Sequence, residues 1–218
     1  MNEHCKGYID ALVASQSKVF GYWFVEELLT DGLMKEINDH FQVLRPGTEF
    51  VLPKEALAYA VAAQITKNDR LILLNLLAKR MNVNVYSWEK CDLLQNVKFM
   101  GSCDYYGQMT KVFKASSINL NITLKISQSG IPLRVMDILG AGGFLLSNYQ
   151  PEIAEYFING EEVVMYESIE DAYEKALFYK DHDDIRKRIV DAGHNKTKEL
   201  FSYEKQLRRI FKLSGIDL

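Results

Sequence analysis

The feature that most constrains the fold is the alternation of short strand-like runs with helix-like runs between residues 82 and 166. The strand-like runs are 82–87, 96–101, 117–123, 143–148 and 161–166. The helix-like runs between them are 105–116, 131–141 and 151–157. Strands that alternate with helical crossovers predict a parallel sheet with helices on both faces. The sequence therefore predicts an α/β fold with a Rossmann-like parallel sheet.

The segment before this alternation is helical in pattern. Apolar residues recur at helical spacing over 6–44, and the turn-rich stretch RPGTEFVLPKE at 45–55 interrupts them. We place a boundary there, with a helical N-terminal segment or hinge at 1–52 and the Rossmann-like domain at 53–218. The second half of ALAYAVAAQIT, which ends at Thr66, is predicted as a buried strand, and 69–80 as an amphipathic helix. From Ser168 onward the chain is predicted to be helical, with Ser168 and Ser202 as N-caps.

Charge and composition exclude several classes of protein. The 218 residues contain 26 basic and 29 acidic side chains, a net charge of −3, which argues against a nucleic-acid-binding surface. The basic runs DIRKR and KQLRR lie on C-terminal helical patterns, so they are solvated helix faces or, at most, peripheral contacts with an anionic membrane. The three cysteines show no metal-binding or disulfide spacing, and the N-terminus is polar. These observations predict a cytoplasmic protein.

Ligands of open parallel sheets bind beyond the carboxyl ends of the strands. Three predicted loops lie there, at 101–107, 125–132 and 147–152. In the middle loop, Gly130 allows a close backbone approach and Pro132 suits the first turn of a helix, whose free N–H groups can cradle a diphosphate. Arg134 adds positive charge, and the Asp137 carboxylate can accept both hydroxyls of a ribose.

A plainer interpretation of the same stretch remains open. Arg134 and Asp137 can form an ordinary i,i+3 surface ion pair, and Gly140, Gly142 and Gly143 can form an ordinary helix–strand turn. The sequence lacks GxxxxGK[ST], and its GAGG follows a helix rather than a strand. Kinase-type and NAD-binding functions are therefore not predicted.

The stretch from Phe113 to Tyr179 resembles the donor-binding, C-terminal domain of GT-B glycosyltransferases, in particular those of the CgeB (spore maturation) type. The likeness extends from about Ala56 to Leu213 and is most specific over 113–166. It implies a nucleotide-diphosphate sugar, such as a UDP- or GDP-sugar, as substrate, with no metal or other cofactor. In the retaining enzymes of this group two glutamates lie eight positions apart, and the second holds the ribose.

The resemblance assigns roles to individual positions. Asp137 occupies the ribose-binding position, whereas Ser129 stands where the other glutamate would contact the sugar. Arg70 and Arg134 are the candidates for the basic clamp on the diphosphate, and no catalytic base is identified. The predicted contacts to the nucleotide sugar are Gly101, Ser129, Gly130, Ile131, Pro132, Arg134, Asp137, Gly142, Gly143, Tyr149, Gln150 and Glu152.

A GT-B enzyme needs two Rossmann-like domains, and only the second is predicted here. The first hypothesis is therefore a donor-binding half whose acceptor half belongs to a longer enzyme or a separate chain. The alternatives are a non-catalytic binding or assembly module, with Tyr22, Trp23 and Phe24 as its interaction surface, and a protein similar to sugar-nucleotide epimerases.

Overall fold

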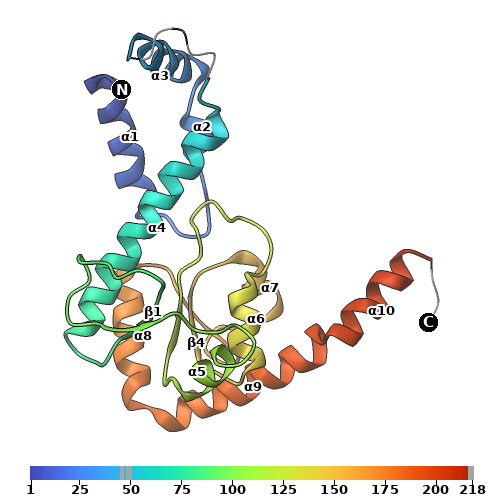
Figure 1. Ribbon diagram of the computed structural model, residues 1–218. Coiled ribbons are helices and arrows are strands. Elements are labelled where there is room, and N and C mark those ends of the chain that lie inside the picture. The colour runs from blue at the N-terminus through green and yellow to red at the C-terminus, as the bar shows by residue number, and fades with distance from the viewer. Residues whose placement is uncertain (45–46, 48–50, 216–218) are drawn as a thin grey trace.

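Three helices form the N-terminal part of the chain. The computed structural model describes residues 1–44, 47 and 51–215. Helices α1 (Glu3–Gln16), α2 (Val25–Leu28) and α3 (Asp31–Leu44) lie together at one end of the molecule (Figure 1). Trp23, from the predicted interaction surface, is only 3% exposed and packs inside this helical core, whereas Tyr22 is 54% exposed.

One long helix, α4 (Lys54–Ala78), connects this part to the rest of the chain (Figure 1). The buried strand predicted to end at Thr66 is wrong, because those residues lie inside α4. The alanine-rich sequence favours helix, and its buried positions Ala58, Val61, Ala62 and Ile65 recur every three or four residues. Residues 45, 46 and 48–50 of the predicted boundary stretch 45–55 lie outside the described residues, and the boundary stays a prediction. Helix α4 contributes its first half to the N-terminal core and its second half to the core of the sheet.

All five strands form parallel pairs. Strand β1 (Asn84–Tyr86) pairs with β2 (Lys98–Gly101), and β4 (Leu145–Asn148) lies between β3 (Asn119–Asn121) and β5 (Val164–Tyr166). Helices α5 (Met109–Ala115), α6 (Leu133–Gly140) and α7 (Pro151–Tyr156) join them in the predicted order. The α/β fold with parallel strands predicted from the alternation is confirmed.

Alternate residues of the strands enter two different cores. Leu146, Val164 and Tyr166 pack with α4 and with α8 (Ile169–Asp181) on one face. Leu145 and Met165 pack with α6 and α7 on the other face. Because both faces are covered, β4 and β5 are buried along their whole length, as is typical of parallel sheets.

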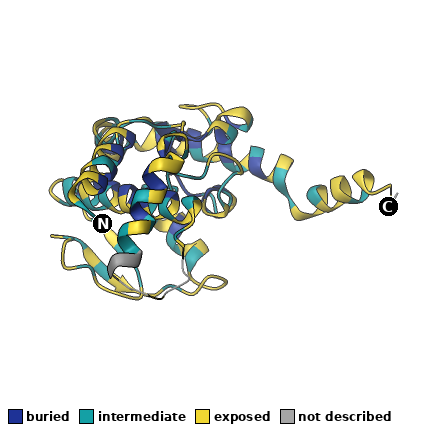
Figure 2. Ribbon diagram, turned by 90° about the horizontal axis from the view of Figure 1, so that it is seen from above, coloured by how far each residue is buried: buried dark blue, intermediate teal, exposed yellow. Residues whose placement is uncertain are grey.

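The C-terminal part is helical, as predicted. The Ser168 side chain caps α8 by accepting from the Asp171 N–H, and Ser202 caps α10 (Tyr203–Leu213) by accepting from the Lys205 N–H. Between them, α9 (Asp183–Phe201) packs against α6. Helix α10 projects away from the rest of the molecule and contains no buried residue (Figures 1 and 2).

Candidate functional site

The candidate site lies at the carboxyl edge of β3 and β4, where the loops 122–132 and 149–150 leave the sheet. Gly130 has φ of +83° and no heavy atom within 4 Å of an added Cβ, so its backbone is open to a ligand. Its N–H donates to Oε2 of Glu152, 2.5 Å away, on α7. The structure thus brings two of the predicted contacts together, from separate loops.

Asp137 presents its carboxylate at the surface of α6. Oδ1 of Asp137 accepts a hydrogen bond of 2.9 Å from the hydroxyl of Tyr105, which lies in the loop after β2. This hydrogen bond to Asp137 raises the pKa of Tyr105 above its ordinary value. The contact joins the loop after β2 to the helix after β3, and a second hydroxyl group could replace that of Tyr105 on the carboxylate.

The other predicted residues of this loop surround the start of α6. Ser129 is exposed, Ile131 packs against the core below, and Pro132 is the N-cap rather than a residue of the first helical turn. Arg134 is exposed, lies over the Phe113 ring at 5.5 Å and forms no ion pair with a described residue. The surface ion pair between Arg134 and Asp137 is therefore absent, which leaves the guanidinium available to an anion.

Two helices that start at this edge differ in their capping. No side chain caps the N-terminus of α6, whereas Ser168 caps α8. The unpaired N–H groups of an uncapped helix favour a negative charge nearby. The N-terminus of α6 is thus better suited to a phosphate than that of α8.

Tyr149 and Gln150 follow β4 at the same edge. The Tyr149 ring lies against Gly21, where an added Cβ would be 2.8 Å from its Cδ1. Gln150 is 6% exposed, and no described residue forms a hydrogen bond with its side chain. Gly101, which ends β2, has φ of +79° and open space around it.

Two of the predicted contacts lie elsewhere. Gly142 and Gly143 connect the end of α6 to the amino end of β4, at the edge opposite the loops. An added Cβ at Gly143 would be 2.7 Å from Nδ2 of Asn119 and from the Phe113 carbonyl oxygen. Gly143 thus serves close packing, whereas Gly142, with φ of +71°, serves the turn between α6 and β4, at the edge away from Gly130.

Sequence reasoning missed a buried ion pair beside this site. Nζ of Lys125, in the loop after β3, lies 3.5 Å from Oδ2 of Asp69 on α4, and both side chains are 6% exposed. Burial lowers the pKa of Lys125 and raises the pKa of Asp69, and each charge opposes the shift of the other. Arg70, a predicted clamp residue, instead donates to the Ile122 carbonyl at 2.9 Å. The burial of Lys125 could not be predicted, because no sequence pattern distinguishes a buried lysine in a loop from an exposed one.

One group of possible metal ligands among the described residues lies in the N-terminal helices. Ligand atoms of His4, Cys5 and Glu36 are all within 4.8 Å of one another. Asn2 and His4 already contact the Glu36 carboxylate, at 2.6 and 3.3 Å.

As for membrane contact, none of the helices described is both long and apolar enough to cross a bilayer.

The comparisons with known proteins agree with this fold. A family model described as "Glycosyl transferase-like" matches residues 67–212, more than half of the chain. The chain therefore belongs to the glycosyl transferase-like family. No curated protein matches it at a significant level.

A solved structure gives the same fold. The crystal structure of a glycosyltransferase from Rickettsia africae ESF-5 is similar, with a TM-score of 0.55 and 13% sequence identity. The match covers 89% of this chain but 54% of the other, so this chain spans about half of that glycosyltransferase.

Proposed function

We propose that the chain is the donor-binding half of a glycosyltransferase of the CgeB type, and that it binds a nucleotide-diphosphate sugar such as a UDP- or GDP-sugar. The observation that carries this proposal is the pairing of Asp137 with the Tyr105 hydroxyl beside the uncapped start of α6. A partly exposed carboxylate about one turn into α6, and free N–H groups at the start of that helix, suit a ribose and a diphosphate respectively.

In this proposal Asp137 accepts hydrogen bonds from the ribose hydroxyls, which displace the Tyr105 hydroxyl. The Gly130 N–H, the first turn of α6 and Arg134 stabilise the negative charge that develops on the leaving nucleoside diphosphate. A phosphate oxygen replaces the Glu152 carboxylate as the acceptor of the Gly130 N–H. Transfer is proposed to need no metal ion, because helix N–H groups and a guanidinium supply the positive charge.

The acceptor-binding half is proposed to come from a further segment of the protein or from another chain. The chain covers 54% of the similar glycosyltransferase, which leaves room for a second domain. That half would supply the acceptor site, the catalytic base if the reaction needs one, and the closed cleft that excludes water.

Thermal unfolding with UDP, GDP, ADP and TDP, each with EDTA, tests the proposal. A site filled to about 100 times its dissociation constant adds about 2.7 kcal/mol to the free energy of unfolding, which raises Tm by several degrees. We expect one nucleotide to raise the Tm of the wild-type chain and to leave the Tm of Asp137→Ala unchanged. The matched control is Asp181→Ala, a substitution at the end of α8. Equal shifts in wild type and Asp137→Ala would contradict the ribose role.

A binding or assembly module is the second candidate, favoured by α10. Its Tyr203 and Leu213 side chains are 90% and 80% exposed. Absence of any nucleotide effect, together with self-association that is lost when 203–218 are deleted, would favour this function instead.

A further inference from the structure

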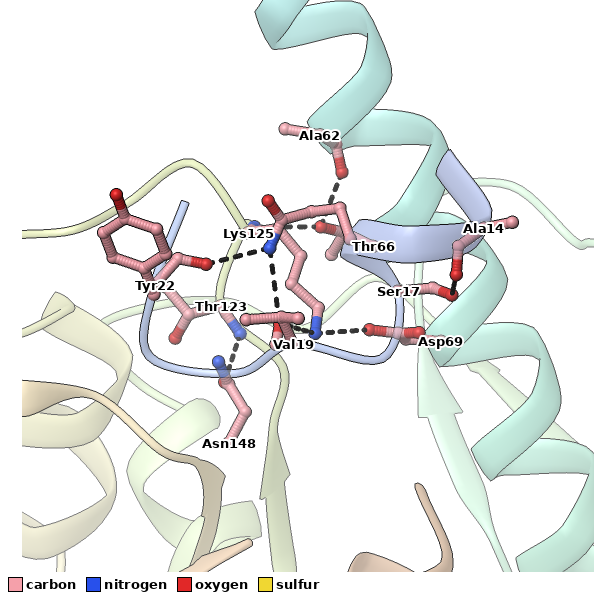
Figure 3. A network of polar contacts seen from close by, with 11 residues as sticks. Ala14, Ser17, Val19, Tyr22, Ala62, Thr66, Asp69, Thr123, Lys125 and Asn148 are labelled. Atoms are coloured by element: carbon pink, nitrogen blue, oxygen red, sulfur yellow. Dashed lines mark hydrogen bonds and ion pairs between the residues drawn. The ribbon is translucent and has the colours of Figure 1, made fainter. Parts of the chain in front are cut away.

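The ammonium group of Lys125 has weak partners for a buried charge. It lies 3.3 Å from the Val19 carbonyl oxygen and 3.5 Å from the Asp69 carboxylate (Figure 3). It also lies 3.1 Å from the centre of the Phe20 ring. Charge-assisted N–H···O bonds normally measure about 2.7–2.9 Å. An ammonium has three donors, and neither oxygen is that close, so Lys125 can still bind a well-placed acceptor.

A small cavity lies beside this ammonium. It has a volume of about 20 Å³ and is lined by Lys125, Ser127, Gln128, Asn148, Gln150 and the segment Val19–Tyr22. Roughly 10–15 Å³ is enough for one water molecule, so one oxygen atom fits there. Asp69 is not part of the lining, so an anion in the cavity meets the ammonium rather than the carboxylate.

Gln150 gives the second sign that the cavity is built for a ligand. Gln150 is 6% exposed and lines the cavity, and its side chain has no hydrogen bond with any described residue. The Gln150 NH2 group is therefore free to donate a hydrogen bond to an oxygen bound in the cavity. The Ser127 hydroxyl, also in the lining, has no hydrogen bond with a described residue either.

The segment Val19–Tyr22, between α1 and α2, forms the opposite wall and is held firmly in place. The buried Gln16 side chain donates to the Tyr22 carbonyl at 2.8 Å and accepts from the Phe24 N–H at 3.0 Å. Gly21, with φ of +76°, lies directly against the Tyr149 ring. The N-terminal segment therefore shapes this cavity together with the sheet.

We infer that this cavity is a subsite for one phosphate oxygen of the donor, bound by the Lys125 ammonium and the Gln150 carboxamide beneath the Val19–Tyr22 wall. The inference rests on the proposed function and adds two residues and a wall from the N-terminal segment to it. The rest of the diphosphate lies outside the cavity, toward the start of α6. The Thr66 hydroxyl accepts a hydrogen bond of 3.1 Å from the Lys125 backbone N–H.

The test compares three variants of the full chain with wild type by calorimetric titration of UDP and GDP and of the corresponding nucleosides. Lys125→Met with Asp69→Asn removes the ammonium without leaving a buried unpaired carboxylate. Asp69→Asn alone keeps the lysine side chain in the cavity wall, and Lys67→Met removes an exposed positive charge from α4. Near-ultraviolet circular dichroism checks that each variant keeps its tertiary packing.

We expect the double variant to weaken diphosphate binding at least tenfold and to leave nucleoside binding unchanged. Asp69→Asn and Lys67→Met should bind the diphosphate within about threefold of wild type. Gln150→Leu, which keeps most of the side-chain volume but removes the carboxamide, should weaken diphosphate binding severalfold. Wild-type affinity in the double variant, or an equal loss in Asp69→Asn, overturns the subsite and leaves the proposed function standing. If no diphosphate binds to the wild-type chain, the proposed function fails and this subsite with it.

Discussion

At the amino edge of β3, β4 and β5 the backbone is packed to contact distance, whereas at the carboxyl edge it leaves a cavity and unpaired polar groups. An added Cβ at Gly193 would lie 2.2 Å from the Glu162 carbonyl oxygen, just before β5. An added Cβ at Gly130, at the other edge, would meet nothing within 4 Å. Glycine therefore serves packing at one edge and access at the other.

The comparison also separates groups that stabilise the fold from groups that are free to bind. At the amino edge, Nδ1 of His194 lies 2.8 Å from the Leu139 carbonyl, and Lys196 pairs with Glu162 at 2.7 Å. At the carboxyl edge, Gln150 has no described partner and Lys125 has only distant ones. Stability and ligand binding should thus respond to different substitutions.

The largest expected effect on stability is that of Gly193→Ala. The methyl group would overlap the backbone before β5, so we expect a loss of more than about 3 kcal/mol in the free energy of unfolding, measured in urea. The control is Gly140→Ala, at the end of α6, where an added Cβ has open space. There we expect a gain of about 0.5 kcal/mol. Wild-type stability in Gly193→Ala would contradict the tight packing of the amino edge.

The second largest loss of stability is expected when only one partner of the buried Lys125–Asp69 ion pair is removed. Lys125→Met leaves the Asp69 carboxylate buried and unpaired, which should cost about 3 kcal/mol, whereas Lys125→Met with Asp69→Asn should cost about 1 kcal/mol or less. The pKa of Asp69 is raised in the folded chain, so the folded state binds more protons and its stability falls as pH rises through that pKa. We therefore expect the single variant to lose less stability at about pH 5 than at about pH 8. Equal losses in the single and double variants would show that the pair does not act as a charge pair.

A smaller effect is expected for the capped helix at the carboxyl edge. Ser168→Ala removes the side chain that accepts from the Asp171 N–H and should cost about 1 kcal/mol, while nucleotide affinity stays unchanged. Ser202→Ala removes the equivalent cap of α10, whose residues are all at least partly exposed, and should leave global unfolding unchanged. A loss of nucleotide affinity in Ser168→Ala would indicate that the nucleotide binds at the start of α8 and not at the start of α6.

Local patterns in the sequence predicted most of the fold. The alternation of strand-like and helix-like runs located the five strands of the described residues, and two serines located the starts of α8 and α10. The error in the second half of 56–66 arose because an alanine-rich apolar run also fits a buried strand, whereas the length of this run and the three-to-four-residue spacing of its buried positions are typical of a helix.

The candidate site was predictable only in part. Gly130, Asp137 and Glu152 follow strands or begin helices, so position along the chain indicated the edge at which they lie. The pairing of Lys125 with Asp69, and the contact of Gly21 with Tyr149, join segments far apart in the sequence. Such contacts depend on how α4 and the N-terminal segment pack on the sheet, and no local pattern encodes them. At Gly143, a glycine needed for packing has the same sequence signature as one needed for access.

The most direct test of the difference between the two edges is nuclear magnetic resonance of the chain labelled with ¹⁵N at its 13 glycines. Each amide signal is assigned by single substitution, and UDP or GDP is then titrated in. We predict that the Gly130 and Gly21 amides shift progressively with nucleotide, while those of Gly143 and Gly193 stay in place. Shifts at Gly143 and Gly193 without a shift at Gly130, or no shift at any glycine, would contradict a donor site at the carboxyl edge.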